Sequence, residues 1–441
     1  MKNISISEYG YIYFEPPNNL TTKFTHNKLD TENEFKELYK SWENSEIIRR
    51  VLSFDGGKYF QAQNYVGIIQ TQNLSIEILP KIYTKGKEEN IRDIFINMLK
   101  VTLGLNSLKG NKANLHVTKN KNIFEGFISL FVNSVDELIK KGLKSSYIEK
   151  EDNQYFLKGK LKFNEHIKRN YVHKERFYVQ FDEYMANRVE NKLLKSTINL
   201  LLKKTNDYQN KKALRQQLFV FDDVNISQNY ESDISKINMH RGMEYYELPL
   251  KFAKVFLKDK SFTSLRGKEN VYALLFPMEK VFENYMEFVL NNSKEALGIK
   301  NILVNGRRNE YFLGSGKCKM ARLQPDYLLE MKGSKDIVTD AKWKILDIKE
   351  DETKDCERVS ISSNDVYQIF SYLHFYDCEY TAYLFVPQTI DFQKEVTFDY
   401  TLQVDQILKR SNKRIKVIPI DLNILKFNNH KLMLNIFEEK N

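Results

Sequence analysis

A charged pair inside an apolar stretch places the strongest limit on how the C-terminal part of this chain can fold. The stretch "IVTDAKW", residues 337–343, is typical of a core strand, yet it contains Asp340 and Lys342. Side chains alternate along a strand, so both charged groups would emerge on the same face. Charged groups in a buried strand need a reason, and a functional site is one.

A second acidic residue lies one turn and one strand upstream. "QPDYLLEM", residues 324–331, predicts a strand near Pro325 and Asp326, and the following "KGSKD" is typical of a turn. We therefore expect two strands, over 323–331 and 336–346, joined as a hairpin. This arrangement would bring Asp326 and Asp340 onto adjacent strands.

Carboxylates on adjacent strands suit a magnesium ion, which prefers hard oxygen ligands. Phosphodiester hydrolysis uses such an ion to activate water and to stabilise charge on the phosphate. The candidate metal ligands are Asp326, Asp340 and the backbone carbonyl of Ala341. Lys342 would hold the attacking water or neutralise the developing charge.

The alternative interpretation is a surface salt bridge, because an acidic residue two before a lysine is a common pattern. Glu330 with Lys332 and Asp347 with Lys349 also match it, and the latter pair runs into the acidic "EDETKD". Asp340 differs because it lies in an apolar strand downstream of a Pro-Asp. This context favours the functional interpretation.

A predicted helix precedes the two strands and supplies further acidic residues. It covers "FPMEKVFENYMEFVLNNS", residues 276–293, and its Glu279, Glu283 and Glu287 are four apart and share a face. Solvated glutamates are the ordinary interpretation of such a face. Glu283 is the candidate to reach the metal.

A second predicted helix follows the strands, over residues 363–376. Gln368 and Tyr372 are four apart on it, so they belong either to the helix surface and core or to a group that covers the site or contacts phosphate. A buried strand, "YTAYLFVP", comes next. The order helix, strand, strand, helix, strand predicts an α/β domain with a mixed sheet.

The rest of the chain has a different organisation. Residues 46–82 are typical of β-structure, and several stretches between 91 and 258 have helical periodicity. The best boundary before the last domain is "SFTSLRGKEN", residues 261–270. We expect an α+β multidomain fold with three parts: a β-rich N-terminal region (1–85), a mostly helical middle (86–265) and a C-terminal α/β domain (266–441).

Composition indicates what kind of partner and which cell compartment suit the protein. The net charge of +10 favours a polyanionic partner, although 58 acidic residues also fit an ordinary solvated surface. There is no apolar run of about 18 residues that would span a membrane, and the N-terminus lacks the pattern of a signal peptide. The 3 cysteines have no metal-type spacing, which fits a reducing cytoplasm.

Several motifs together resemble a known family. "QPDYLLE", "TDAKWK" and "DVYQIFSY", in that order, resemble the PD-(D/E)XK nuclease superfamily, and specifically the McrC subunits of McrBC-type restriction systems. Upstream, "YVGIIQTQNLSIEILPKI", "LKGKLKFNEHIKRN" and "MEKVFENYMEFVL" are similar to other McrC segments. The ordered set covers most of the chain and is more specific than the catalytic motif alone.

The resemblance implies the roles of individual residues. Asp326, Asp340 and Lys342 match the catalytic motif, Gln368 matches the helix motif after it, and Glu283 matches less securely. The implied cofactor is Mg²⁺, with Mn²⁺ as a substitute. The implied reaction is hydrolysis of double-stranded DNA, and two sites would be needed to cut both strands, so dimerisation or assembly is expected.

The resemblance also implies a partner and a place in the cell. McrC-like chains dock through their N-terminal part onto a hexamer of McrB, an AAA+ GTPase that binds the GTP, and they act in cytoplasmic phage defence against DNA containing 5-methylcytosine. Relatives that recognise unmethylated DNA remain an alternative. A further alternative is a non-catalytic adaptor that activates its motor partner and keeps the nuclease fold as a scaffold.

Overall fold

The computed structural model divides the chain into two compact units. One contains Met1–Gly110 with Leu265–Asn441, and the other contains Asn111–Ser264. The first unit is thus built from two separate pieces of sequence. The structure describes residues 2–18, 20–21, 23–82, 88–104, 122–257, 272–306, 311–315, 318–346, 348–351, 356–376, 378, 381–389, 392–404 and 407–422.

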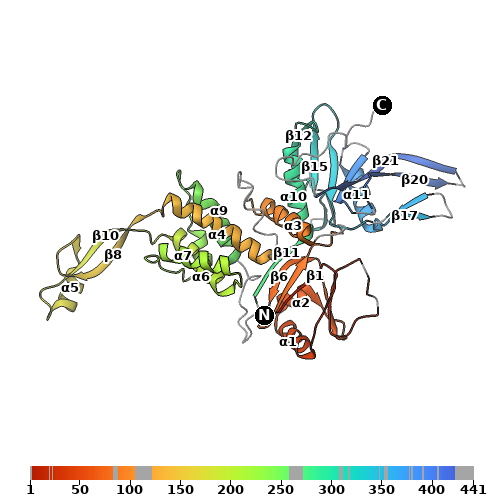
Figure 1. Cartoon of the computed structure of the whole chain (residues 1–441). Coiled ribbons are helices and arrows are strands. Elements are labelled where there is room, and N and C mark those ends of the chain that lie inside the picture. Colours follow the sequence, from red (N-terminus) through yellow and green to blue (C-terminus); the bar gives the residue numbers. More distant parts are fainter. Residues whose placement is uncertain are drawn as a thin grey trace. The chain divides into compact units, whose positions relative to one another are not determined.

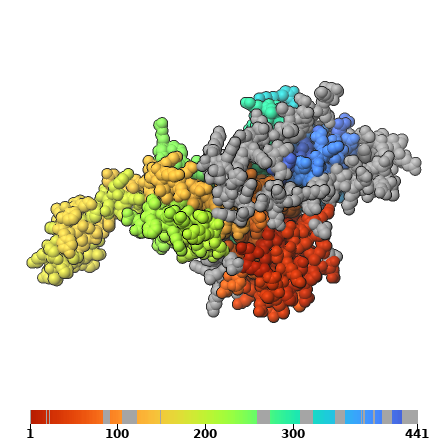
Figure 2. All heavy atoms as spheres, in the orientation of Figure 1, coloured from red at the N-terminus to blue at the C-terminus, as the bar shows by residue number. Residues whose placement is uncertain are grey.

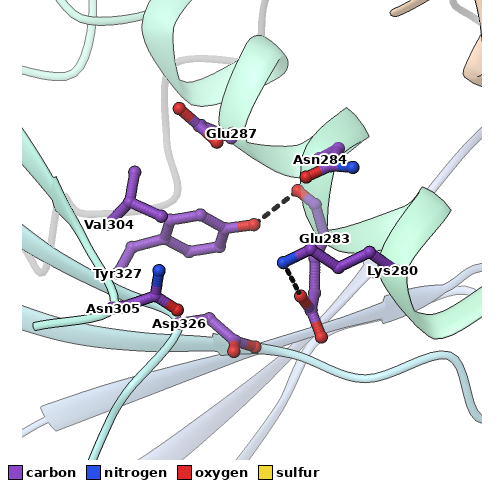
Figure 3. A pocket seen from close by; sticks show the side chains of 8 residues that line it. All are labelled: Lys280, Glu283, Asn284, Glu287, Val304, Asn305, Asp326 and Tyr327. Atoms are coloured by element: carbon purple, nitrogen blue, oxygen red, sulfur yellow. Dashed lines mark hydrogen bonds and ion pairs between the residues drawn. The ribbon is translucent and has the colours of Figure 1, made fainter. Parts of the chain in front are cut away.

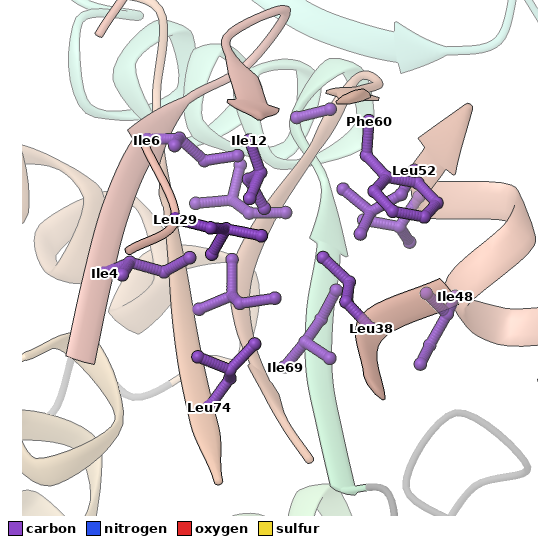
Figure 4. Close-up of a cluster of buried hydrophobic side chains, with 14 of the residues drawn as sticks. Ile4, Ile6, Ile12, Leu29, Leu38, Ile48, Leu52, Phe60, Ile69 and Leu74 are labelled. Atoms are coloured by element: carbon purple, nitrogen blue, oxygen red, sulfur yellow. The ribbon is translucent and has the colours of Figure 1, made fainter. Parts of the chain in front are cut away.

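The N-terminal part of the first unit contains two small sheets around one hydrophobic core (Figures 1 and 4). One sheet has the strand order β1 (Lys2–Ser7), β7 (Leu74–Leu79), β6 (Tyr65–Gln70) and β11 (Tyr272–Pro277). The other has the order β3 (Asn27–Lys28), β2 (Tyr11–Tyr13), β5 (Tyr59–Ala62) and β4 (Leu52–Ser53). The helices that contribute to this core are α1 (Glu32–Asn44) and α2 (Glu46–Val51).

The prediction of β-structure over 46–82 is right for its later part and wrong for its start. Residues 46–51 form α2, because the side chain of Ser45 caps the helix by accepting a hydrogen bond from the N–H of Ile48. Ile48 and Val51, three apart, then bury one face of this short helix.

Strand β11 completes the N-terminal sheet, although it comes from the region predicted to start the last domain. It pairs antiparallel with β6, and Leu275 lies opposite Gly67. Gly67 has φ +141, and a Cβ there would lie 1.9 Å from the carbonyl oxygen of Leu274. Only glycine allows the two strands to approach this closely.

Helix α3 (Glu88–Thr102) also belongs to the first unit. It packs on α10 (Met278–Asn292), and the ring of Phe95 contacts that of Phe276 with centroids 6.1 Å apart. The predicted division assigned this helix to the middle region. The three-part division stays a prediction, and its boundary segment 261–270 lies outside the described residues.

The C-terminal part of the first unit contains a mixed sheet. Its order is β12 (Ile299–Val304), β15 (Tyr327–Met331), β16 (Ile337–Ala341), β19 (Thr381–Pro387), β21 (Ile407–Ile420) and β20 (Val396–Val404). β15 and β16 pair antiparallel as the predicted hairpin, whereas β16, β19 and β21 run parallel. Two-stranded ribbons accompany it: β13 (Tyr311–Ser315) with β14 (Cys318–Leu323), and β17 (Ile348–Asp351) with β18 (Cys356–Val359).

Helices α10 and α11 (Ser363–Phe375) pack on opposite faces of this sheet (Figure 1). Successive strand residues point to opposite faces. The hydroxyl of Tyr327 reaches α10, where it donates to the carbonyl of Glu283, while the neighbouring Leu328 packs with Tyr372 of α11. The mixed sheet is confirmed, and so are the two predicted helices, the hairpin and the following strand β19. The prediction missed β12, β13 and β14 between α10 and β15, and β17 and β18 before α11. The PD-(D/E)XK assignment stays a prediction.

The second unit combines helices with a small antiparallel sheet. Its helices are α4 (Ile123–Lys141), α6 (Val189–Lys204), α7 (Tyr208–Val220), α8 (Tyr230–Ser235) and α9 (Glu244–Leu257). The sheet has the order β8 (Ser146–Gln154), β10 (Phe177–Met185) and β9 (Lys160–Leu161), with α5 (Phe163–Asn170) at its far end (Figure 1). Edge contacts between Phe127 and Phe131 of α4 and Phe252 and Phe256 of α9 form its core.

Within the described ranges, every helix is too short or too polar to cross a bilayer.

Candidate functional site

The hairpin of β15 and β16 brings the two predicted aspartates together. Tyr327 pairs with Thr339, so one step further along the ladder Asp326 comes opposite Asp340. The backbone N–H of Ala341 donates a hydrogen bond to Oδ2 of Asp326 at 2.8 Å, which fixes that carboxylate against the end of β16. Asp340 is 1% exposed, so its charge lies within the protein.

The electrostatics of this pair favour a bound cation. The pKa of Asp326 is raised to about 8: burial and then the charge of Asp340 raise it, and they outweigh the Ala341 N–H and Lys342, which lower it. Two carboxylates this close resist simultaneous ionisation unless positive charge lies between them. A divalent ion would supply that charge.

Lys342 lies beside Asp340, as the alternation of the strand predicts. Its Nζ is 2.7 Å from Oδ2 of Asp340, and the side chain is largely buried. Burial by itself lowers the pKa of Lys342, but the charge of Asp340, a hydrogen bond to it and the charge of Asp326 outweigh this effect and raise the pKa. Lys342 is therefore a cation next to the two aspartates.

The carboxylate of Asp340 has few hydrogen-bond donors around it. Its contact among the described residues is the ion pair with the Lys342 ammonium, and neither oxygen has a backbone or uncharged side-chain donor. Buried carboxylates normally have such donors. These oxygens fit a magnesium ion held by one or two carboxylates, with water completing the shell.

No third acidic, histidine or cysteine side chain completes a metal-binding group in the part of the chain that the structure describes. Asp326 and Asp340 thus form a carboxylate pair. The carbonyl of Ala341 remains the predicted third protein ligand, and its role stays a prediction.

Glu283 lies near the pair but forms its own contact. It lines a small hollow together with Asp326, Tyr327 and residues of α10 and β12 (Figure 3). Its Oε2 is 2.8 Å from Nζ of Lys280, one turn earlier on α10. The structure therefore places Glu283 at the edge of the site, with its charge directed to a lysine.

Gln368 is joined to the site through Tyr372. Its Nε2 donates to the hydroxyl of Tyr372 at 2.6 Å, and that hydroxyl donates to the carbonyl of Gln324 at 2.9 Å. Gln324 immediately precedes Pro325 and Asp326. Burial, and then the charge of Asp340, raise the pKa of Tyr372, which keeps its hydroxyl protonated as a donor.

Comparisons with known proteins identify the family of the chain. The sequence model of the family described as "McrBC 5-methylcytosine restriction system component" matches residues 60–387. The chain belongs to the McrBC family. Every candidate residue from Glu283 to Gln368 lies inside the matched region of this McrBC-family chain.

Solved structures resemble the same fold. One is a Thermococcus gammatolerans assembly of McrB AAA+ hexamers with bound McrC, with 19% sequence identity, 95% of each chain covered and a TM-score of 0.67. Another, a McrBC complex from the same organism, has 22% identity over 66% of this chain and 87% of that chain, with a TM-score of 0.46. A comparison with curated proteins returns no match.

Some residues around the site of this McrBC-family chain escaped the sequence analysis. Asn305, in the hollow, has φ 60, and its N–H donates to the carbonyl of Asp326 at 2.8 Å (Figure 3). The dipeptide Asn305-Gly306 is a turn signal that could have indicated it. Lys280 is three residues before Glu283, a spacing that predicts an ion pair.

Proposed function

We propose that this chain is the DNA-cleaving subunit of a McrBC-like, GTP-dependent restriction system. The observation that carries the proposal is the pair Asp326 and Asp340, opposite each other on a hairpin, with Lys342 beside them. Membership of the McrBC family supports the restriction role. The reaction would be Mg²⁺-dependent hydrolysis of a phosphodiester bond in double-stranded DNA.

Each residue would have a defined task in that reaction. Asp326 and Asp340 would hold the ion through their oxygens, with the carbonyl of Ala341 as a third ligand. A bound Mg²⁺, or Mn²⁺ in its place, supplies an activated water and neutralises charge on the phosphate. The Lys342 ammonium would orient the attacking water or stabilise the charge that develops on the phosphate. Gln368 and Tyr372 would keep the loop before Asp326 in position.

The proposal includes a motor partner. A related solved assembly contains McrC bound to McrB AAA+ hexamers. We expect this chain to dock in the same manner on a McrB-like hexamer, to stimulate its GTPase and to leave GTP binding to the partner. Cutting both strands would then require two nuclease sites, supplied by dimerisation within the assembly.

The second unit offers a surface suited to such docking. Its small sheet and α5 form the yellow lobe in Figure 2 and carry many exposed apolar side chains. They are Tyr147, Tyr155, Phe156, Leu157, Phe163, Ile167, Tyr171, Val172 and Tyr184. Exposed apolar side chains gathered on one small lobe are characteristic of protein contacts. Docking would therefore involve this lobe as well as the N-terminal region 1–85.

Plasmid cleavage tests the proposal directly. Methylated and unmethylated plasmids are incubated with the chain, a McrB-like partner, Mg²⁺ and GTP, with Asp340→Ala as the matched control. Cutting that requires the partner, GTP and Asp340 supports the nuclease, and the preferred plasmid gives the methylation dependence. GTPase stimulation without cutting would instead favour the adaptor function.

A further inference from the structure

A buried glutamate in the N-terminal region lies against the segment that carries Lys342. Glu8 is 0% exposed and lies between β1 and β2. The next residue, Tyr9, has φ 62, a left-handed conformation that is costly for a tyrosine. Backbone hydrogen bonds from Glu8 to Leu79 and from Tyr9 to Ala62 hold this turn. The fold thus maintains a strained turn that keeps this carboxylate inside the protein.

The contacts of Glu8 extend far along the sequence. Its Oε2 accepts a hydrogen bond from the backbone N–H of Lys81 at 3.0 Å and another from Nε1 of Trp343 at 2.9 Å. Its Oε1 has no hydrogen-bond partner among the described residues. Burying a carboxylate is costly, and an apolar side chain would fill this space at lower cost. An apolar residue at this position would lose the hydrogen bonds to Lys81 and to Trp343.

Trp343 connects two elements of the candidate site. It is 2% exposed and directly follows Lys342. Its ring packs against that of Phe282, with centroids 5.4 Å apart, and Phe282 directly precedes Glu283. The indole is thus fixed on one side by the Glu8 carboxylate and on another by α10.

Charged groups surround this contact. The pKa of Glu8 is raised to about 7, because burial, with a small contribution from the charge of Glu279, outweighs Lys81 and the two hydrogen bonds, which lower it. Burial lowers the pKa of Lys81, and the charge of Lys344 lowers it further, whereas the charges of Glu8 and Glu279 raise it. These charges lie next to the segment between the end of β16 and α11.

We propose that Glu8 is a positioning residue for Lys342, acting through Trp343. The N-terminal region would then help to build the cleavage site in addition to its expected docking role. This inference rests on the proposed nuclease function. Glu8 lies before residues 60–387, the region that matches the family model.

The test compares conservative variants in the full assembly. Glu8→Gln keeps the size of the side chain but weakens the acceptor, and Trp343→Phe keeps most of the ring but removes the donor. Each is assayed with the McrB-like partner for cleavage rate, GTPase stimulation and melting temperature. Glu295→Gln, an exposed glutamate in the same unit, is the matched control, and Asp340→Ala defines the background.

The expected result is a separation of activities. Each variant should lower the cleavage rate about tenfold or more, while GTPase stimulation and melting temperature stay near those of the wild type. Because both variants break the same contact, the double variant should be no slower than the slower single variant. Trp42 and Trp343 are the tryptophans of the chain, so in a Trp42→Phe background Glu8→Gln should also change the indole emission of Trp343.

Three outcomes would overturn the inference. Wild-type cleavage rates in both single variants would remove the positioning role. A parallel fall of cleavage, GTPase stimulation and melting temperature would show a general structural role. Fully additive losses in the double variant would mean that the two residues act separately. If the wild type does not cut, or Asp340→Ala cuts as fast as the wild type, the proposed function itself fails, and the positioning role fails with it.

Discussion

Two buried carboxylates, one in each unit, differ in the number of hydrogen-bond donors that surround them. In the second unit, both oxygens of Glu125 accept hydrogen bonds, from the N–H groups of Asn206 and Asp207 and from the side chains of Thr205 and Asn210. In the first unit, Asp340 pairs with the Lys342 ammonium, and neither of its oxygens has a backbone or uncharged side-chain donor among the described residues. A carboxylate with a full set of donors holds a fold together, whereas one without them is available to a ligand.

The largest expected effect is on DNA cleavage, and it distinguishes Asp340 from Glu125. Asp340→Asn and Glu125→Gln make the same chemical change at two sites. We expect Asp340→Asn to lower plasmid cleavage by about 100-fold or more, since a metal ligand matters at least as much as the groups that orient it. Glu125→Gln should leave the cleavage rate per folded molecule unchanged. Equal losses of cleavage in both variants would show that Asp340 has no role in the reaction beyond that of a structural buried acid.

The next effect concerns the stability of the same two variants. Glu125→Gln turns an amide N–H₂ toward groups that are themselves donors, so it should lower the free energy of unfolding by about 1–3 kcal/mol. Asp340→Asn removes the repulsion between the two aspartates but also the ion pair with Lys342, so it should change the melting temperature less than Glu125→Gln does. Thermal unfolding without added metal measures both. A clear destabilisation by Asp340→Asn would indicate that Asp340 is structural.

A smaller effect is expected from the hydroxyl of Tyr372, which links α11 to the loop before Asp326. Tyr372→Phe removes two hydrogen bonds, one from Gln368 and one to Gln324. Loss of the bond to Gln324 alone is worth about 1 kcal/mol, so cleavage should fall by about fivefold or more. Tyr367→Phe, an exposed position on the same helix, is the control. Unchanged cleavage in Tyr372→Phe would mean that the link through Gln368 has no part in the site.

A separate effect is a pH dependence of stability at Glu8. Burial raises the pKa of this acid from 4.5 to about 7, so the folded chain holds a proton that the unfolded chain releases. Stability should therefore fall as pH rises from about 4.5 to 7. Glu8→Gln, which cannot ionise, should make the melting temperature less dependent on pH in this window. If the melting temperature depended on pH equally in the wild type and in Glu8→Gln, this would argue against a raised pKa of Glu8.

Local sequence patterns were sufficient for the part of the site that lies on one hairpin. Asp326, Asp340 and Lys342 could be predicted together because strand alternation and a turn of a few residues determine their geometry. Gln368 was predicted from helix spacing, but its connection through Tyr372 to Gln324 depends on how α11 packs. The role of each residue in catalysis stays a prediction.

Contacts between distant parts of the sequence could not be predicted in this way. The donors around Glu125 come from the loop before α7 and from α7 itself, and the partner of Glu8 is Trp343. No periodicity in the sequence connects such positions, because their proximity depends on the packing of whole elements. The same reason explains why β11 was not assigned to the N-terminal sheet.

The pairing of β11 with β6 has a consequence for synthesis on the ribosome. Tyr272 pairs with Gln70, so about 200 residues must be translated between the two halves of one ladder. At about 5–20 residues per second, β6 waits roughly 10 to 40 seconds with an open edge. An open strand edge can pair with other chains. The nascent chain is thus most exposed to aggregation while the second unit is being made, and slower translation of that unit should lower the yield of folded protein.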